Sequence, residues 1–250
     1  MRILRAPINP TSRIAAVLHT FYLVLLPLVV VGLVYGRFIL IALVVIILSK
    51  WRMLAVKPRY WLANIRSNMV DIIVGFSVVS FMSGSRILST ILLWGGIYSF
   101  WLIVIKPRSS PLMVGAQAFI AQGLSLVALF SNHSHIHPVF LVAFTWLICF
   151  SASRHFLATF SDDANRSLSH IWGLFGAEMA LILGHWHIVY SGAIPQIALV
   201  LSVIGYALAV GYYVHKTKGL SSGTRRQLIV FCVIVLVLVL LQPDWQAQTF

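Results

Sequence analysis

The sequence predicts an all-α integral membrane protein, a polytopic bundle of about nine transmembrane helices. Of its 250 residues 60% are hydrophobic and only 9% are charged, whereas about a quarter of the residues in a soluble domain are charged. Stretches such as 39–48 and 228–241 contain no charged residue at all. The apolar runs are continuous, whereas a membrane β-barrel shows alternation over about ten residues. The sequence therefore indicates that a lipid bilayer surrounds this chain.

A bilayer core about 30 Å thick needs about 20 mostly apolar residues for each crossing helix. Nine segments meet this description approximately: Ile14–Val34, Phe38–Lys50, Met69–Ser83, Ile87–Ile105, Leu112–Phe130, Val139–Phe156, His170–Tyr190, Ile194–Tyr213 and Gln227–Leu241. Charged residues or turn signals bound these segments. The second, third and last segments are short, so flanking cations must reach the interface or the bilayer must thin. No long linker interrupts the chain, so we expect residues 1–250 to form one membrane domain.

Positive charge predicts the orientation, because loops rich in Lys and Arg stay on the cytoplasmic side. Once the nine spans are drawn, only Arg37 and Arg86 of the 18 Lys and Arg residues fall on the opposite side. We therefore expect a cytoplasmic N-terminus and a multi-pass protein of the cell (inner) membrane. This distribution also explains the net charge of +13 without a nucleic-acid partner, because no soluble stretch is long enough to bind one.

The cytoplasmic segment from Lys50 to Arg66 interleaves aromatic residues with five cations. Its aromatic residues are Trp51, Tyr60 and Trp61. This mixture is typical of an anchor at the membrane interface. We expect anionic lipid headgroups to be the counter-charge, the alternative being a specific lipid-recognition site.

Only one of the five acidic residues lies deep in a predicted span. Asp162 and Asp163 fall in a cytoplasmic loop, Asp244 follows the last span, and Asp71 lies near the cytoplasmic mouth of the third span. Glu178 is eight residues into the seventh span, roughly 12 Å from its start. Charged residues within the hydrocarbon cost about 2.5–3.5 kcal/mol on insertion scales, so Glu178 is a candidate functional residue.

Helical geometry divides the seventh span into two faces. A stripe of small residues would let another helix approach closely: Gly173, Ala177, Ala180 and Gly184. A second face, about 120° away, carries Ile171, Leu174, Glu178, Leu181 and His185. An ionisable group is expected to avoid lipid, so we expect this helix near the centre of the bundle with neighbours on at least two sides.

Two interpretations of Glu178 remain open. It is either a structural acid hydrogen-bonded to Gln117 or Gln122 of the fifth span, or a proton or cation site in a polar cavity. In the second interpretation, Glu178 and His185 line the pathway of an ion or small solute.

Five histidines gather on the extracytoplasmic side of the predicted topology. They are His133, His135, His137, His185 and His187. Neutral imidazole is the commonest metal ligand, so a transition-metal site for Zn, Cu or Ni is one hypothesis. The alternative is a set of interfacial histidines, similar in role to the neighbouring Trp186 and Tyr190. The sequence indicates no other cofactor.

The loop before the seventh span is the most polar connection of the chain. Asp162, Asp163 and Arg166 are of the types that hold Mg²⁺ and a phosphorylated substrate. Such chemistry generally needs a second acidic cluster, and Asp71 is the only other acid near this face. The alternative is that Ser161, Asp162 or Asp163 caps the start of the seventh helix.

These observations favour a non-enzymatic membrane protein that transports or conducts a small solute or ion. A structural or assembly subunit of a larger membrane complex, with partner subunits in the membrane, is the second hypothesis. The third is a membrane-embedded metal-dependent enzyme that uses the histidines or the Asp162–Asp163 loop.

Overall fold

The computed structural model describes residues 13–53, 55–132, 136–185, 195–217, 219 and 221–241. These residues form a wholly helical fold, as the composition predicts. The helices are α1 (Arg13–Tyr35), α2 (Ile39–Leu48), α3 (Trp61–Ser83), α4 (Leu88–Phe100), α5 (Pro111–Ser131), α6 (Pro138–Leu157), α7 (Asn165–His185), α8 (Gln196–Thr217) and α9 (Ser222–Leu241). Two short 3₁₀ turns, η1 (Trp51–Met53) and η2 (Pro58–Tyr60), separate α2 from α3, and a π-helical turn, η3 (Trp101–Ile105), extends α4.

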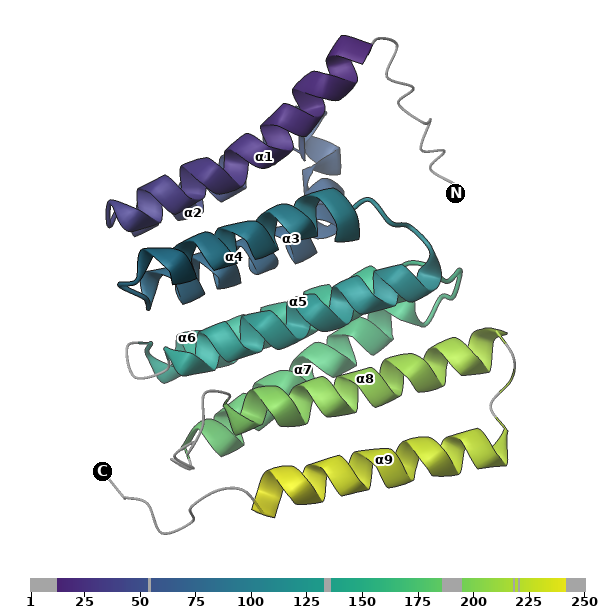
Figure 1. Ribbon diagram of the computed structural model, residues 1–250. Coiled ribbons are helices and arrows are strands. Elements are labelled where there is room, and N and C mark those ends of the chain that lie inside the picture. Colours follow the sequence, from purple (N-terminus) through teal and green to yellow (C-terminus); the bar gives the residue numbers. More distant parts are fainter. Residues whose placement is uncertain are drawn as a thin grey trace.

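The helices lie roughly side by side, and α1 and α9 are at opposite edges of the arrangement (Figure 1). Within the described residues, five helical segments are long and apolar enough to cross a membrane: Pro58–Ser83, Leu88–Ile105, Pro111–Ser131, Pro138–Leu157 and Gln196–Thr217. Two shorter apolar stretches, Phe21–Tyr35 and Ile39–Leu48, accompany them. Large apolar side chains such as Leu40, 77% exposed, face outward. The fold is compatible with a helical membrane bundle.

Every predicted span coincides with a helix, but three helices begin five or more residues earlier than the hydropathy indicates, among them α7, which starts at Asn165 instead of His170. Helix α3 starts at Trp61 instead of Met69, and α9 starts at Ser222 instead of Gln227. The first turns of both contain polar residues, among them Asn64, Arg66 and Arg225, which continue a helix without being apolar. The predicted end of the seventh span, residues 186–190, lies outside the described residues.

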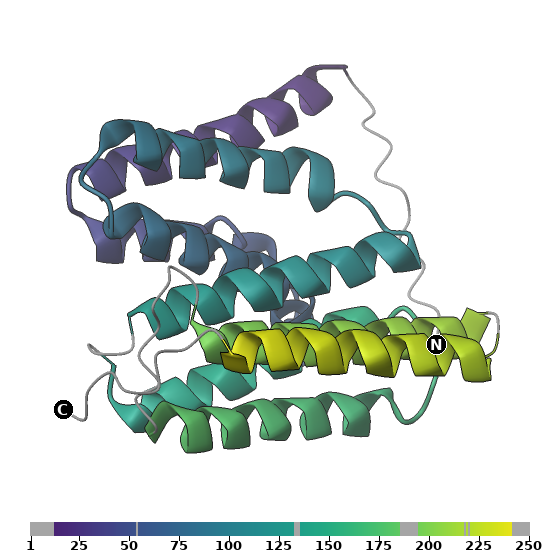
Figure 2. The same cartoon turned by 60° about the horizontal axis from the view of Figure 1, so that its bottom comes forward.

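The centre of the bundle is formed by α3 and α5. Helix α3 packs against α1, α2, α4, α5 and α6, while α5 packs against α3, α6 and α8. The core includes fully buried Val74 and Val78 of α3, Leu126 of α5 and Tyr98 of α4. Helix α7 packs mainly on α6 (Figures 1 and 2). It also contacts α8 and, through Trp172, Gln122 of α5, so the expected neighbours on at least two sides are present, whereas the expected central position is wrong.

The small residues of α7 explain why it packs so closely on α6. A Cβ atom added to Gly173 would lie 3.0 Å from the indole nitrogen of Trp146, and one added to Gly176 would lie 2.7 Å from Sγ of Cys149. Ala180, on the same face, is buried. The sequence predicts this close approach from the spacing of Gly173 and Ala180, and the structure identifies α6 as the neighbour.

Candidate functional site

Glu178 lies on the outward face of α7. Its side chain is exposed, and the large residues one turn before and after it, Leu174 and Leu181, are 55% and 52% exposed. No hydrogen bond or ion pair links Glu178 to another described residue. The expectation that Glu178 faces the interior of the bundle is wrong for a single chain, because the opposite face of α7 is the one that packs on α6. Its role in a pathway stays a prediction.

The two glutamines proposed as partners of Glu178 have other contacts. Gln122 of α5 accepts a hydrogen bond from the Trp172 indole at 3.0 Å and donates one to the Leu201 carbonyl at 3.1 Å. It thereby joins α5, α7 and α8. Gln117, also of α5, bonds to the end of η3 and to His155 of α6.

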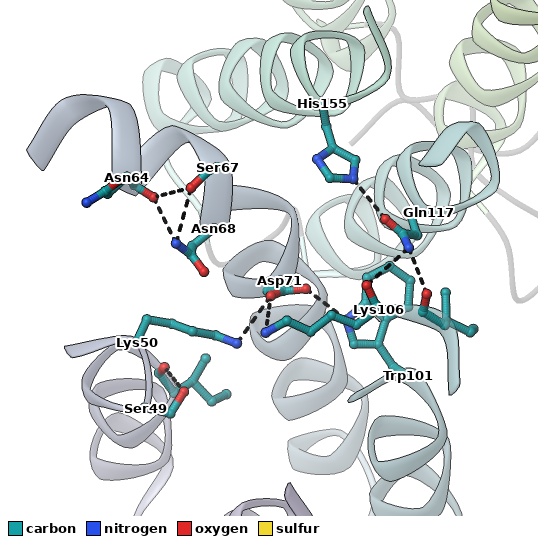
Figure 3. Close-up of polar contacts among 12 residues, drawn as sticks. Ser49, Lys50, Asn64, Ser67, Asn68, Asp71, Trp101, Lys106, Gln117 and His155 are labelled. Carbon is teal, nitrogen blue, oxygen red and sulfur yellow. Dashed lines mark hydrogen bonds and ion pairs between the residues drawn. The ribbon is translucent and has the colours of Figure 1, made fainter. Parts of the chain in front are cut away.

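The structure places a different acid in the interior. Asp71 of α3 accepts contacts from two lysines through Oδ2, at 3.2 Å from Nζ of Lys50 and 2.5 Å from Nζ of Lys106. The indole of Trp101 donates a hydrogen bond to Oδ1 at 3.3 Å. Figure 3 shows the two lysine side chains converging on this carboxylate. We call Lys50, Asp71, Trp101 and Lys106 the ionic cluster.

Three separate elements position the ionic cluster. Lys50 follows the end of α2, Asp71 comes from α3, and Trp101 and Lys106 stand at the start and just after the end of η3. In a π-helical turn the backbone bonds run from residue i to i+5, and the Lys106 N–H donates to the Trp101 carbonyl at 2.9 Å. This turn brings both residues to the same carboxylate.

The ionic cluster carries one more positive than negative charge and is largely shielded from solvent. The side chains of Lys50 and Asp71 are 8% and 11% exposed, whereas that of Lys106 is 33% exposed. A buried charge is tolerated when it is paired, and here one carboxylate compensates two ammonium groups. Asp71 therefore ties α2, α3 and η3 together.

A set of hydrogen bonds made by Gln117 of α5 links the end of η3, next to the ionic cluster, to α6. Nε2 of Gln117 donates to the carbonyls of Ile105, at 2.7 Å, and Arg108, at 2.8 Å, which end η3 and its following turn. Oε1 of Gln117 accepts from Nε2 of His155 at 2.9 Å (Figure 3). The contact requires the tautomer of His155 that carries the proton on Nε2. Gln117 thus adds a side-chain donor to carbonyl groups at and just after the end of η3, where the Ile105 carbonyl also accepts from the Arg108 N–H at 3.3 Å.

Tyr98 of α4 lies about one helical turn before Trp101 along the chain and is fully buried. Its hydroxyl oxygen has no described hydrogen-bond partner. A Cβ atom added to Gly75, one turn beyond Asp71 on α3, would lie 3.1 Å from that oxygen. The Tyr98 side chain therefore packs against the α3 backbone at Gly75, which has no side chain.

The polar loop before α7 is organised as a structural junction. Asp162 pairs with Lys216 of α8 at 2.6 Å, accepts a hydrogen bond from the Tyr212 hydroxyl at 2.9 Å, and accepts one from the Ala164 N–H at 3.1 Å. Asn165, the first residue of α7, donates to the Leu157 and Phe160 carbonyls. These contacts join the loop to α6 and α8, and because the Ala164 N–H that Asp162 accepts from precedes α7, capping of the helix stays a prediction. Asp163 and Arg166 are exposed.

Asp162 gives this junction a defined pH dependence. The hydrogen bond from Lys216, aided by the Ala164 N–H and Tyr212, lowers the pKa of the Asp162 carboxyl from 3.8 to about 2. A pKa lowered by folding means that the carboxylate stabilises the fold above the unfolded pKa, near 4, and that this contribution is lost as the pH falls toward about 2.

We expect a carboxyl-carbon NMR titration of Asp162 to give a midpoint near 2 in the wild type. Lys216→Ala should raise this midpoint toward 3.8, because it removes the largest cause of the shift. Arg166→Ala, which removes a nearby exposed cation, is the control and should leave the midpoint unchanged. An Asp162 midpoint that is insensitive to Lys216→Ala would contradict this account of the junction.

Most of the predicted metal ligands cannot be placed. His133, His135 and His187 lie outside the described residues, as does the side chain of His185. His137 precedes α6, and its Nδ1 accepts a hydrogen bond from the Val139 N–H at 3.4 Å. No group of three or more His, Cys, Asp or Glu side chains suited to a metal occurs among the described residues. The histidine site stays a prediction.

The chain was compared with known protein families, curated proteins and solved structures, and none of them matches it.

Sequence reasoning places Lys50, Asp71 and Lys106 on the cytoplasmic side without bringing them together. A usable signal exists. Asp71 is the only acid near the cytoplasmic ends of the first five predicted spans, where it is surrounded by cations. A lone carboxylate near the end of a predicted span, with cations in the flanking loops, is expected to form an ion pair when the fold buries it.

Proposed function

We propose that this protein is a subunit of a larger assembly in the membrane, and that α7 provides the surface on which a partner docks. The observation that supports this proposal is the exposed position of Glu178. It stands between the exposed apolar side chains of Leu174 and Leu181. Intramembrane carboxyl groups almost always face a protein interior or a water-filled cavity. A neighbour that covers α7 would give Glu178 such an environment.

The proposal includes the membrane setting. The chain lies in the cell (inner) membrane as a multi-pass protein with a cytoplasmic N-terminus, in the orientation that the positive loops predict. Anionic lipid headgroups contact the cytoplasmic side near η1 and η2, where Trp51 and Tyr60 are 59% and 48% exposed. The guanidinium of Arg59 lies 4.7 Å from the centroid of the Tyr60 ring, a combination suited to the interface.

The size of the particle extracted gently from native membranes tests the proposal. We expect a protein mass clearly above the 27.9 kDa of one chain, and a shift toward that mass in Glu178→Leu, which removes the polar group from the face. Leu93→Ala, on the exposed side of α4, is the matched control and should leave the size unchanged. A wild-type particle that contains one chain alone would contradict the proposal.

Transport or conduction of an ion or small solute is the second candidate, and the ionic cluster favours it. Paired charges, the η3 turn and the buried Tyr98 hydroxyl occur together near one end of the central helices, and π-helical turns are frequent at functional sites. Ion flux into vesicles containing the purified protein tests this candidate. Flux that is present in the wild type and lost in Asp71→Asn, with the helix content unchanged, would support it.

A further inference from the structure

Helix α2 ends about halfway along the bundle. Its ten residues, Ile39–Leu48, amount to roughly 15 Å, whereas the core of a bilayer is about 30 Å thick. The start of α2 lies level with the end of α3, because the guanidinium of Arg37 donates a hydrogen bond to the Ser83 carbonyl at 3.4 Å. Lys50, which follows α2, therefore meets Asp71 near the middle of α3. The ionic cluster thus lies well inside the bundle.

At this depth the ionic cluster has more hydrogen-bond donors and more positive charge than Asp71 balances. The ammonium of Lys50, whose side chain is 8% exposed, carries three N–H donors and has one acceptor among the described residues, Oδ2 of Asp71. Lys106 contacts the same oxygen, and the Trp101 indole donates to the other one. One carboxylate therefore serves two ammonium groups and an indole, and the ionic cluster keeps an excess positive charge.

A further polar atom near Asp71 has no partner among the described residues. The hydroxyl oxygen of Tyr98 is fully buried, and it lies 3.1 Å from the position that a Cβ atom on Gly75 would occupy. Gly75 is one helical turn beyond Asp71 on the same face of α3, and the Cβ atoms of such positions are about 5–6 Å apart. The Tyr98 hydroxyl therefore adds a hydrogen-bonding group on the inner side of the ionic cluster.

One member of the ionic cluster is accessible from outside the protein. The side chain of Lys106 is 33% exposed. Contact between an ammonium group and hydrocarbon is costly, so we expect the exposed part of Lys106 to face water. Asn64 and Asn68, both partly exposed, precede Asp71 on the same face of α3, toward the end that is predicted to be cytoplasmic (Figure 3). Polar groups therefore extend from this end of α3 to the ionic cluster.

We propose that the ionic cluster is a binding site for a small oxyanion of the phosphate type, which enters from the cytoplasmic side and contacts Lys106 and Lys50. Such an anion offsets the excess positive charge, and its several oxygen atoms accept from the N–H donors that Asp71 leaves unused. A lipid headgroup carries the same phosphate chemistry, but headgroups lie at the membrane surface, whereas Asp71 lies near the middle of α3. The site therefore takes the soluble ion. The inference concerns α2, α3 and η3, so it does not rest on the proposed role of α7.

The thermal stability of the purified full chain, in a non-ionic detergent, tests this inference. Inorganic phosphate replaces gluconate at constant ionic strength, and chloride replaces gluconate in a parallel series. A ligand that binds the folded protein raises the midpoint of unfolding as its concentration rises above the dissociation constant. We expect phosphate to stabilise the wild type and chloride to have little effect. Equilibrium binding of radiolabelled phosphate should be saturable in the same concentration range.

Three variants locate the phosphate on the ionic cluster. Lys106→Met removes the excess charge and leaves Lys50 paired with Asp71, so we expect the fold to persist. Its half-saturating phosphate concentration should rise about tenfold or more, the loss expected for one hydrogen bond to a charged group. Lys106→Arg keeps the charge and the donors and should bind phosphate nearly as the wild type does. Lys57→Met, which removes an exposed cation on the same side, is the matched control and should leave phosphate binding unchanged.

The outcomes separate a site from a structural ion cluster. Phosphate binding that Lys106→Met loses and Lys106→Arg keeps supports the inference. A purely structural Lys106 would change the midpoint without phosphate, and an unchanged response to phosphate in Lys106→Met would overturn the site. Equal effects of phosphate and chloride, or of Lys57→Met and Lys106→Met, would indicate charge screening and also overturn it. Stabilisation by phosphatidylglycerol in mixed micelles, without a response to inorganic phosphate, would assign the ionic cluster to a lipid headgroup instead of a soluble ion. None of these results depends on the particle size of Glu178→Leu, so either proposal can fail while the other stands.

Discussion

Asp71→Ala is expected to destabilise the bundle more than any other single replacement of a charged residue among the described elements. It leaves Lys50 buried and Lys106 half-buried with no opposing charge. Removing one partner of a buried ion pair typically costs about 3–5 kcal/mol, because the remaining charge keeps its desolvation penalty. The free energy of unfolding, measured by titration with a denaturing detergent, should fall by that amount.

Two control variants separate the loss of pairing from a general effect of removing an acid. Asp163→Ala, at an exposed position, should leave the free energy of unfolding almost unchanged. Lys50→Met combined with Asp71→Leu should recover most of the loss, because apolar side chains of similar size often replace a buried pair without cost. A wild-type stability for Asp71→Ala would show that the ionic cluster does not hold α2, α3 and η3 together.

Gly95→Leu is expected to have the second largest effect, through the contact of α4 with α1. A Cβ atom at position 95 would lie 2.5 Å from Cγ2 of Val31, a distance that real Cβ atoms do not reach. Val31 is buried and β-branched, so its side chain has little freedom to move away. Overpacking of this kind typically costs about 1–3 kcal/mol. The same detergent titration measures it.

The neighbouring glycine supplies the control for this prediction. Gly96 has no atom within 4 Å of its added Cβ, so Gly96→Leu should be tolerated. Gly95→Ala should lower the free energy of unfolding for the same reason. Adding Val31→Ala, which makes room on α1, should restore part of that loss. If Gly95→Leu and Gly96→Leu were equally stable, α1 and α4 would not pack through this glycine.

The sequence predicts the helices well because the hydrophobic requirement of a bilayer acts on each span separately. Nine apolar segments correspond to nine described helices, and the short length expected of the second is confirmed by α2, which has ten residues. The start of α3 is missed because its first turns carry Asn64 and Arg66, whose side chains reach the polar region while the backbone stays helical. The number of crossings and their direction stay predictions.

The interior polar contacts depend on which helices are neighbours, and no local pattern determines that. Lys50, Asp71 and Lys106 lie far apart along the chain and meet only because α2, α3 and η3 converge. The face of α7 that carries Glu178 is predicted to point into the bundle and points outward instead, for a similar reason. Spacing identifies its two faces correctly, but the small-residue face meets α6 and the face with Glu178 turns outward. The rule that polar groups avoid lipid, applied to one chain, places Glu178 inside the bundle, whereas the structure turns it outward.

The most direct test of the proposal that a partner covers α7 is the lipid exposure of its outward face, which carries Leu174 and Glu178, in the intact membrane. A spin label at Leu174→Cys reports collisions with oxygen dissolved in the hydrocarbon, and a label at Leu93→Cys reports the value for an exposed position of the same protein. The account predicts that position 174 is protected from oxygen relative to position 93, and that adding Glu178→Leu abolishes the protection. Equal oxygen accessibility at positions 174 and 93 in the protein with Glu178 intact would contradict the claim that a partner covers α7.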